Sequence, residues 1–547
     1  MSNESESRTS RRSARSRHRR GKHNSPQNKI IPSSVSGARQ PIARNIPLRN
    51  VDVGETDANA EYFIARRAQR TPMYLRAYYE WNASSSEELL NGEKFFIHGQ
   101  KGTGKTAILR HLENSSSPNY HTEFIVFRKE IVEEAQLANL ATTFSASVVV
   151  DEEKIKETRF YYHAMKRLLL AILLSKSNVI EEDIPEDASW FKKIYADIRN
   201  STVGQVASLV TDSVIGSIEA VNIDVSKATK GIATVNPALA IKRSNDAFQK
   251  FAFSQFDKRQ LKTRIFLDEM HFAYRDKQTL GADAALVRDT VLAVREINEK
   301  LIERNIDSLI YMSIRSEFLE HQEIAVSDIA HTIESYGVEI SWESSPYDRA
   351  HPMFQIALER LKLSIGPELT RDVMLQRYIP RSNIEDFLQY TWGKPRDIVR
   401  YFKSAKLSYG NNASIRGNEY NNVIRRYSQS AWQDVKAALT AFVPKNCLPP
   451  LEDALQKIAN CNFDNSVMFD RGTLQDYLTP CFIEMKKTGV TYDISELIKL
   501  LYIVGVFYAM YRDANGQMIV HQFHRGNRHP AANAKFYVHR AVARAFS

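Results

Sequence analysis

The chain has 547 residues, of which 43% are hydrophobic and 25% are charged, as is ordinary for globular proteins. This length predicts three or four domains, and three cysteines are too few for a disulfide-built scaffold. The net charge of +10 lies in residues 1–50, which hold twelve Lys or Arg and two acids. The remaining chain has 62 basic and 62 acidic residues, so the folded body is not expected to be a polycation.

Residues 1–56 are predicted to form a disordered basic tail, because the stretch 8–20 is rich in Ser and Arg and lacks aromatic residues. Such a tail could bind nucleic acid by releasing counterions, it could touch an anionic surface, or it could be a solvated extension; the sequence leaves these readings open. No apolar segment follows the charges, and the longest apolar stretch, 500–510, is too short to cross a bilayer. We therefore expect a cytoplasmic protein with no membrane partner.

From residue 57, the pattern predicts helices up to about residue 90, and then strands that alternate with helices. This alternation is typical of a parallel sheet covered on both faces. The predicted strands are 95–98, 123–127, 264–267, 309–312 and 337–342. The first domain is expected to span 57–344, with a helical insertion at about 131–255 that includes an amphipathic helix at 160–174. That insertion is either a structural subdomain or an element that binds partners.

The segment 99–106, GQKGTGKT, fits the phosphate-binding loop pattern G-x-x-x-x-G-K-[ST] between a predicted strand and a predicted helix. Its glycines allow backbone N–H groups to converge on phosphate oxygens at the positive end of the helix. Lys105 is expected to reach the β- and γ-phosphates, and Thr106 to ligate Mg²⁺. The candidate nucleotide-binding residues are Gly99, Gln100, Lys101, Gly102, Thr103, Gly104, Lys105, Thr106 and Ala107.

Three further segments are expected to complete this site. The strand 264–267 runs into Asp268, a candidate Mg²⁺ ligand, and Glu269, a candidate base that would polarise the attacking water. The next strand runs into Arg315, which would face the γ-phosphate from between the loop and Asp268. The segment 392–397, WGKPRD, opens a helix at which Arg396 could fold over the nucleotide. The alternative for both arginines is an ordinary helix start.

Helices at 345–425 are expected to form a lid, and residues 426–547 a winged-helix domain. In the latter, Asp493 caps a helix that ends near residue 503, and the turn 513–516 joins a two-stranded ribbon. The wing and its flank are basic at Arg525, Arg528, His529, Lys535 and Arg540, whereas the expected recognition helix offers Ser495, Glu496 and Lys499. This neutral set favours packing on the nucleotide domain over reading DNA. For His521, His524, His529 and His539, exposed histidines are favoured over a metal site.

Together, these motifs resemble the AAA+ and STAND branch of P-loop ATPases, above all a prokaryotic group with a helical lid and a C-terminal winged helix. The segments 427–432, YSQSAW, and 536–541, FYVHRA, are similar to that group too, so the resemblance covers about 57–547. It implies an α/β P-loop fold and slow hydrolysis of ATP with Mg²⁺. It also implies that Glu269, Lys105, Arg315 and Arg396 are catalytic, the two arginines acting as sensors.

By analogy, the function is an ATP-dependent molecular switch in signalling or defence. The alternatives are an initiator-like, ATP-dependent DNA-binding protein and a structural adaptor. The expected partners are ATP, nucleic acid through the tail or the wing, and further copies of the chain in a homo-oligomer. In such an oligomer, Arg304 is the candidate arginine finger.

Overall fold

The computed structural model describes the greater part of the chain from residue 44 onward. The described ranges are 44–127, 160–176, 237–269, 277–319, 329–342, 348–380, 384–440, 443–461, 468–488, 492–513, 515–523, 529–531 and 533–547, with the single residues 184, 191 and 490. Most of the predicted insertion, 131–255, therefore lies outside the described residues. Its described parts are chiefly α7 (Phe160–Ser175) and α10 (Pro237–Arg259). The helix α7 was predicted, but residues 165–174 are buried on all sides, so it does not have the exposed polar face of an amphipathic helix.

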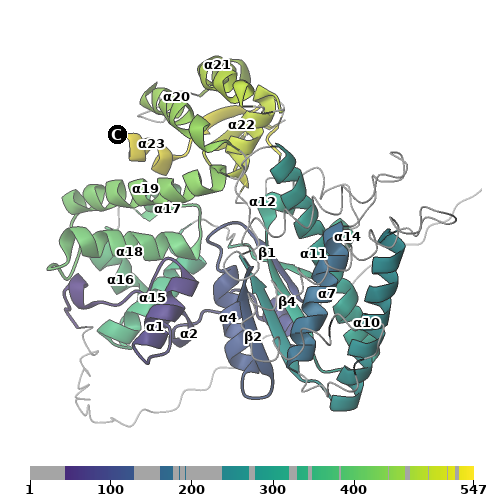
Figure 1. Ribbon diagram of the computed structural model, residues 1–547. Coiled ribbons are helices and arrows are strands. Elements are labelled where there is room, and N and C mark those ends of the chain that lie inside the picture. Colours follow the sequence, from purple (N-terminus) through teal and green to yellow (C-terminus); the bar gives the residue numbers. More distant parts are fainter. Residues whose placement is uncertain are drawn as a thin grey trace, which may run out of the picture. The chain divides into compact units, whose positions relative to one another are not determined.

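A five-stranded, fully parallel sheet in the order β2-β3-β4-β1-β5 carries the first half of the chain, as predicted. Its strands are β1 (Phe96–Gly99), β2 (His121–Val126), β3 (Thr263–Asp268), β4 (Leu309–Arg315) and β5 (Gly337–Glu339). Figure 1 shows α4 (Lys105–Ser116) on one side of this sheet and α7 and α11 (Lys277–Glu303) on the other. All six residues of β3 are buried, as expected for a strand covered on both faces.

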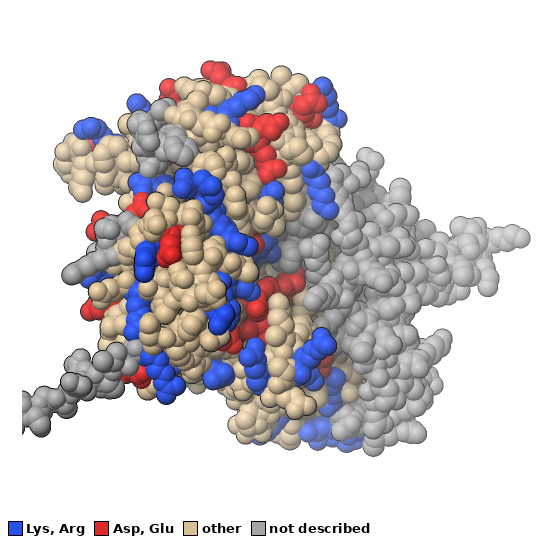
Figure 2. All heavy atoms as spheres, turned by 90° about the vertical axis from the view of Figure 1, so that its left-hand side faces the viewer, with Lys and Arg blue, Asp and Glu red and all other residues tan. Residues whose placement is uncertain are grey.

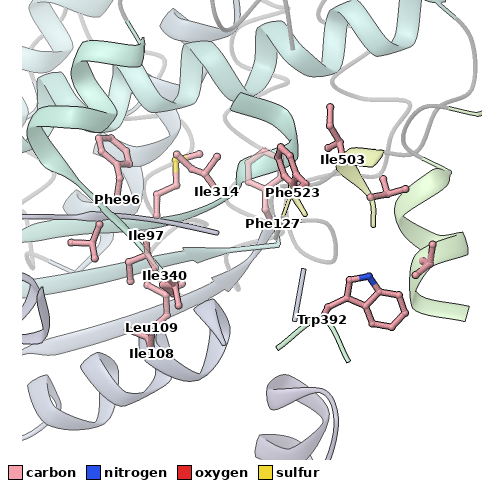
Figure 3. Packing of buried hydrophobic residues seen from close by; sticks show 14 of the residues in the cluster. Phe96, Ile97, Ile108, Leu109, Phe127, Ile314, Ile340, Trp392, Ile503 and Phe523 are labelled. Atoms are coloured by element: carbon pink, nitrogen blue, oxygen red, sulfur yellow. The ribbon is translucent and has the colours of Figure 1, made fainter. Parts of the chain in front are cut away.

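The core on the α4 side joins strand and helix through aliphatic and aromatic side chains. Figure 3 shows Ile97 of β1 close to Ile108 and Leu109 of α4, and all three are almost fully buried. Ile108 and Leu109 lie three and four residues after Lys105, on the face that a helix turns toward its sheet. Burial of this face fixes the start of α4, and with it the loop that leads into the helix.

The fifth strand is shorter than predicted: it ends at Glu339, whereas the sequence pattern predicted an end at residue 342. Ile340 still donates its N–H to the carbonyl of His98 (2.8 Å). The indole N–H of Trp342 then donates to the carbonyl of Thr103 in the phosphate loop (2.8 Å). Beyond the end of the strand, Trp342 is thus attached to the phosphate loop.

The prediction that the tail extends to residue 56 is wrong for residues 44–56. Leu48, Val51 and Val53 are almost fully buried, and the backbone N–H of Leu48 donates to the carbonyl of Asn412 (2.8 Å). These apolar residues are too few and too irregularly spaced to predict a helix or a strand, so their burial was not predicted from the sequence. Residues 1–43 lie outside the described residues.

Figure 2 shows Lys and Arg intermixed with Asp and Glu on one face, consistent with the balanced charge after residue 50.

Helices predominate in the rest of the described chain. Before β1 come η1 (Leu48–Asn50), α1 (Ala58–Arg67), α2 (Met73–Arg76) and α3 (Ala83–Leu90). Between β4 and β5 come α12 (Ser316–Leu319) and α14 (Ile329–Tyr336). After β5 come α15 (Pro352–Ile365), α16 (Arg371–Tyr378), α17 (Ile384–Gln389), α18 (Pro395–Tyr409) and α19 (Gly417–Leu439). The last helix runs across the predicted lid boundary at residue 425.

The C-terminal region begins with η6 (Lys445–Cys447), α20 (Leu448–Cys461), α21 (Arg471–Lys487) and α22 (Ile494–Ile503). It continues with β6 (Phe507–Arg512), β7 (Met518–His521), β8 (Lys535–Val538) and α23 (Arg540–Phe546). Asp493 caps α22 as predicted, accepting from the N–H of Glu496 (2.8 Å), and β6 and β7 form the predicted hairpin.

Two predictions about this region are wrong. The ribbon has a third strand, because β8 pairs with the other edge of β6 after a long connection that hid the pairing. His539 is buried instead of exposed, since its ring stacks on Trp392 with the centroids 4.0 Å apart. The indole N–H of Trp392 also donates to the carbonyl of Gly505 (3.0 Å), so the start of α18 is attached to the C-terminal region.

Candidate nucleotide-binding site

The phosphate loop connects β1 to α4 in a conformation that its glycines permit. Gly102 and Gly104 have φ values of +89° and +100°, in the left-handed region that other residues rarely adopt. Gly104 is also the N-cap of α4, and a Cβ atom placed there would point into open space. The N-terminus of a twelve-residue helix therefore faces a gap beside the loop, where its unbonded N–H groups and its dipole attract an anion.

Lys105 is held inside the loop. Its Nζ atom donates to the carbonyls of Gly99 (2.7 Å) and Gln100 (2.8 Å). The hydroxyl of Thr103 also donates to the Gln100 carbonyl (2.9 Å), while Trp342 holds Thr103 from the other side. These bonds fix the shape of the loop before any ligand is considered, so little ordering is left to oppose binding.

The end of β3 brings a carboxylate to the start of α4. The hydroxyl of Thr106 donates to Oδ2 of Asp268 (2.8 Å), and the hydroxyl of Ser313 donates to Oδ1 (2.6 Å). Asp268 is 2% exposed. Hydroxyl and carboxylate oxygens are the ligands that Mg²⁺ prefers, so this pair fits the predicted metal site. Ser313 and Arg315 reach the same edge because β4 lies between β3 and β1, with Arg315 opposite Gly99.

Glu269 follows Asp268 in an unusual backbone conformation, with φ of +57°. Such a conformation in a residue other than glycine costs about 1–3 kcal/mol and is concentrated at functional sites. The amide of Asn59, from α1, donates to Oε1 of Glu269 (3.4 Å) and to Oδ2 of Asp268 (3.3 Å). Arg110 in turn donates to the Asn59 oxygen (3.3 Å). Asn59 was not predicted, because a single Asn in a helix carries no motif.

Charged side chains of α18, α19 and the phosphate loop form a cluster, which we call the Asp434 cluster: Lys101, Arg396, Arg400 and Asp434. The Asp434 carboxylate, from α19, lies 3.2 Å from Nη1 of Arg396 and 3.5 Å from Nζ of Lys101. It also pairs with Arg400. Burial alone would raise the pKa of Asp434, but the three cations together hold it well below its usual value. Burial lowers the pKa of Lys101 to about 8, against the attraction of Asp434. Asp434 was not predicted, because no motif surrounds it in the sequence.

These parts surround one cavity of about 350 Å³, a volume typical of small-ligand sites. The predicted residues that line it are Lys101, Gly102, Gly104, Lys105, Thr106, Ala107, Asp268, Glu269, Arg315 and Arg396. Gly99, Gln100 and Thr103 support the loop from behind through the bonds described above. The remainder of the lining includes Glu61 and Arg360, which lie 3.6 Å apart. The structure thus brings all predicted catalytic and metal-ligating residues to one place.

Other candidates lie elsewhere. Arg304 follows α11 and precedes β4, at the edge of the sheet opposite the phosphate loop, and pairs with Asp257 (2.8 Å). Arg525, Arg528 and His524 lie outside the described residues.

Within the described ranges, no three His, Cys, Asp or Glu side chains are placed to hold a metal ion. None of the helices in the same ranges is both long and apolar enough to cross a membrane.

The parallel sheet and the loop between β1 and α4 define the chain as an α/β protein with the P-loop NTPase fold. No protein-family model matches the chain, and no curated protein matches it. Among solved structures, it is similar to the Orc1 protein of Aeropyrum pernix in complex with DNA. The identity is 10%, the match covers 87% of this chain and 94% of that chain, and the TM-score is 0.35. A similarity at this level assigns neither an activity nor a partner, so the functional argument rests on the site.

Proposed function

We propose that the protein is an ATP-binding molecular switch of the AAA+ or STAND-like kind that hydrolyses ATP slowly. The observation that carries this proposal is the convergence of Lys105, Asp268, Glu269, Arg315 and Arg396 on one cavity at the N-terminus of α4. A base, a hydroxyl–carboxylate pair and three cations are the groups that phosphoryl transfer to water requires.

Each of these residues has a distinct role in the proposal. Lys105 and the loop N–H groups bind the β- and γ-phosphates, and Arg315 adds positive charge from β4. Thr106 and Asp268 would hold Mg²⁺, which neutralises phosphate charge when it is bound. Glu269 orients the attacking water and accepts its proton. The preference for ATP over other triphosphates follows from the motif resemblance, so a test of binding should include GTP.

Slow turnover follows from the partners of two residues. Asn59 holds the carboxylate of Glu269 (3.4 Å), and Asp434 holds the guanidinium of Arg396 (3.2 Å). Arg396 must leave Asp434 to reach a phosphate, and Asn59 competes with water for the Glu269 carboxylate, which can accept several hydrogen bonds. The need for this exchange favours a protein that dwells in each nucleotide state, as a switch does.

The switch output is proposed to pass from the lid to the C-terminal region, which we interpret as a winged helix. Trp392 precedes Arg396 by four residues and bonds to the carbonyl of Gly505. A shift of Arg396 toward a third phosphate would therefore move the attachment of the C-terminal region. In α22, Ser495 bonds to Gln475 of α21 (3.1 Å), and Glu496 pairs with Lys499 of the same helix (3.4 Å), so both contacts stay within the C-terminal region. The preference for packing over reading DNA is supported instead by the bond of Trp392 to Gly505.

Hydrogen exchange in the presence of ATP and of ADP tests this proposal. We expect protection to differ between the two nucleotides at 391–397 and at 503–507, with the remainder of β6 as an internal reference. Identical exchange with both nucleotides, each shown to be bound, would refute the switch. Failure of every triphosphate to bind would refute the nucleotide site itself.

A further inference from the structure

Asp434 is an anion placed among the cations of the cavity, whose lining also includes the acids Glu55, Asp57, Glu61, Asp268 and Glu269. It lines the cavity together with Lys101, Arg396 and Arg400, and it contacts all three cations. Its side chain is 32% exposed, so it faces the cavity instead of being enclosed in the lid. A carboxylate in this position repels a triphosphate and already occupies the cations that would bind one.

We propose that Asp434 competes with the third phosphate for Arg396 and Lys101, and thereby sets how strongly the site distinguishes ATP from ADP. This inference rests on the proposed nucleotide site. A γ-phosphate carries enough charge to draw Arg396 away from one carboxylate, whereas the shorter ADP leaves the Asp434 cluster intact. Asp434 is thus a specificity-determining residue that acts through Arg396.

Asp434 would release Arg396 and Arg400 when it changes partners. Each of these arginines has either a second anionic neighbour or a hydrogen-bond donor that is not used. Arg400 lies 3.8 Å from Asp397 as well, so it keeps an anionic neighbour when Asp434 moves. The Nε atom of Arg396 is buried without a hydrogen-bond partner in the described chain. A buried donor without a partner is unfavourable, and an additional anion would relieve it. Arg396 therefore has a donor that a phosphate could satisfy and that Asp434 does not use.

The start of the lid helix does not depend on Asp434. Asp397 accepts from the backbone N–H groups of Trp392 (2.9 Å) and Lys394 (3.1 Å), and so fixes the first turn of α18. Asp434 also has space to withdraw, because it borders a second cavity of about 40 Å³ that Val504 also lines. The carboxylate can therefore change partners without unfolding α18 or α19.

The test compares ATP and ADP affinities of the parent with those of Asp434→Asn. We expect ATP to bind about tenfold more tightly, as for one charge-assisted contact no longer contested. ADP affinity should stay within about twofold, because ADP does not engage Arg396. In an Arg396→Ala background, Asp434→Asn should change the ratio of ATP to ADP affinity less than it does in the parent, because only Lys101 is then contested.

Glu452→Gln is the matched control. Glu452 pairs with Lys436 of α19 (3.1 Å), but it does not line the cavity, so this variant should bind both nucleotides like the parent. Should Asp434→Asn fold poorly, Asp434→Ser removes the same charge, and the difference between ATP and ADP in thermal stabilisation replaces the titration.

Three outcomes are decisive. An unchanged ratio of ATP to ADP affinity in a folded Asp434 variant would overturn the competition. An equal loss of both affinities, with Glu452→Gln unaffected, would instead make Asp434 a structural support of the lid. A parent protein that binds neither nucleotide would refute the proposed function and not the competition alone, so the two failures are distinguishable.

Discussion

The two halves of the nucleotide cavity are built in different ways. The sheet half consists of residues at the ends of β1, β3 and β4, and the positions of the parallel strands determine where these residues lie. The lid half consists of charged side chains from α18 and α19, which are joined to each other and to Lys101 by ion pairs. Backbone geometry thus fixes the first half, and side-chain electrostatics fixes the second.

This difference separates two tasks. Asp268 is 2% exposed and its oxygens accept from two hydroxyl groups, so the sheet half keeps one arrangement whichever nucleotide is bound. The side chains of Arg396 and Asp434 are 20% and 32% exposed, and ion pairs of this kind exchange partners at small cost. We therefore expect mutations in the sheet half to abolish binding or chemistry, and mutations in the lid half to change discrimination between nucleotides.

The largest effect is expected for Lys105→Ala in the sheet half. The Lys105 amine lies inside the loop, at the position where the β- and γ-phosphates would meet it, so its loss should reduce ATP binding below detection. Isothermal titration measures this directly. Lys94→Ala is the control, because Lys94 is half-buried and donates to the carbonyl of Ser335 outside the cavity. Parent-like affinity of Lys105→Ala would show that the loop does not bind phosphate.

The same contrast explains what the sequence could predict. The phosphate loop, Asp268, Glu269 and Arg315 each adjoin a strand, and the carboxyl ends of parallel strands share one edge of the sheet. A local pattern is therefore enough to bring them together. Asp434 and Asn59 come from helices distant in sequence, and their roles depend on packing that no local pattern encodes.

The fold, too, was predictable only where neighbouring residues in the sequence determine it. The hairpin β6–β7 was predictable because only five residues, 513–517, separate its strands, whereas β8 pairs with β6 only after a long connection. Leu48 and Val51 were missed because they pack against the lid from a short segment without periodic spacing.

The second largest effect is expected for Glu269→Gln. The substitution removes the proposed base but keeps the shape of the side chain, so turnover should fall by about 10²–10⁴ while ATP affinity is retained. Phosphate release under single-turnover conditions reports the chemical step. Glu334→Gln is the control, since the side chain of Glu334 is 82% exposed and the residue is distant from the phosphate loop in the sequence. Parental turnover in Glu269→Gln would assign the base to another residue.

A smaller effect is expected for Arg396→Ala in the lid half. Arg396 should contact only the third phosphate, so ATP binding should weaken relative to ADP binding by about 1.5–3 kcal/mol. The four affinities of parent and variant give this difference. Arg371→Ala, which removes a lid arginine bonded to Gln355 outside the cavity, should leave both affinities unchanged. Equal losses for ATP and ADP would reduce Arg396 to a support of the lid.

The smallest effect is expected for the pH dependence of Lys101, where the two halves meet. Burial lowers the pKa of Lys101 to about 8, with the nearby Arg315 and Arg396 acting in the same direction and Asp434 in the opposite one. The amine is therefore charged at pH 7 and neutral at pH 9. Bound phosphates favour the charged form, so ATP binding should raise this pKa and take up a proton in the window just above pH 8.

Titration calorimetry at pH 8.5, in two buffers with different ionisation enthalpies, measures this uptake. We expect an apparent enthalpy that depends on the buffer at pH 8.5 but not at pH 7, and an ATP affinity that falls by about two- to tenfold between pH 7 and pH 9. Lys101→Met should remove the buffer dependence and flatten this decline. Buffer dependence that persists in Lys101→Met would place the titrating group elsewhere in the cavity, and the Asp434 cluster would then not sense the phosphates through Lys101.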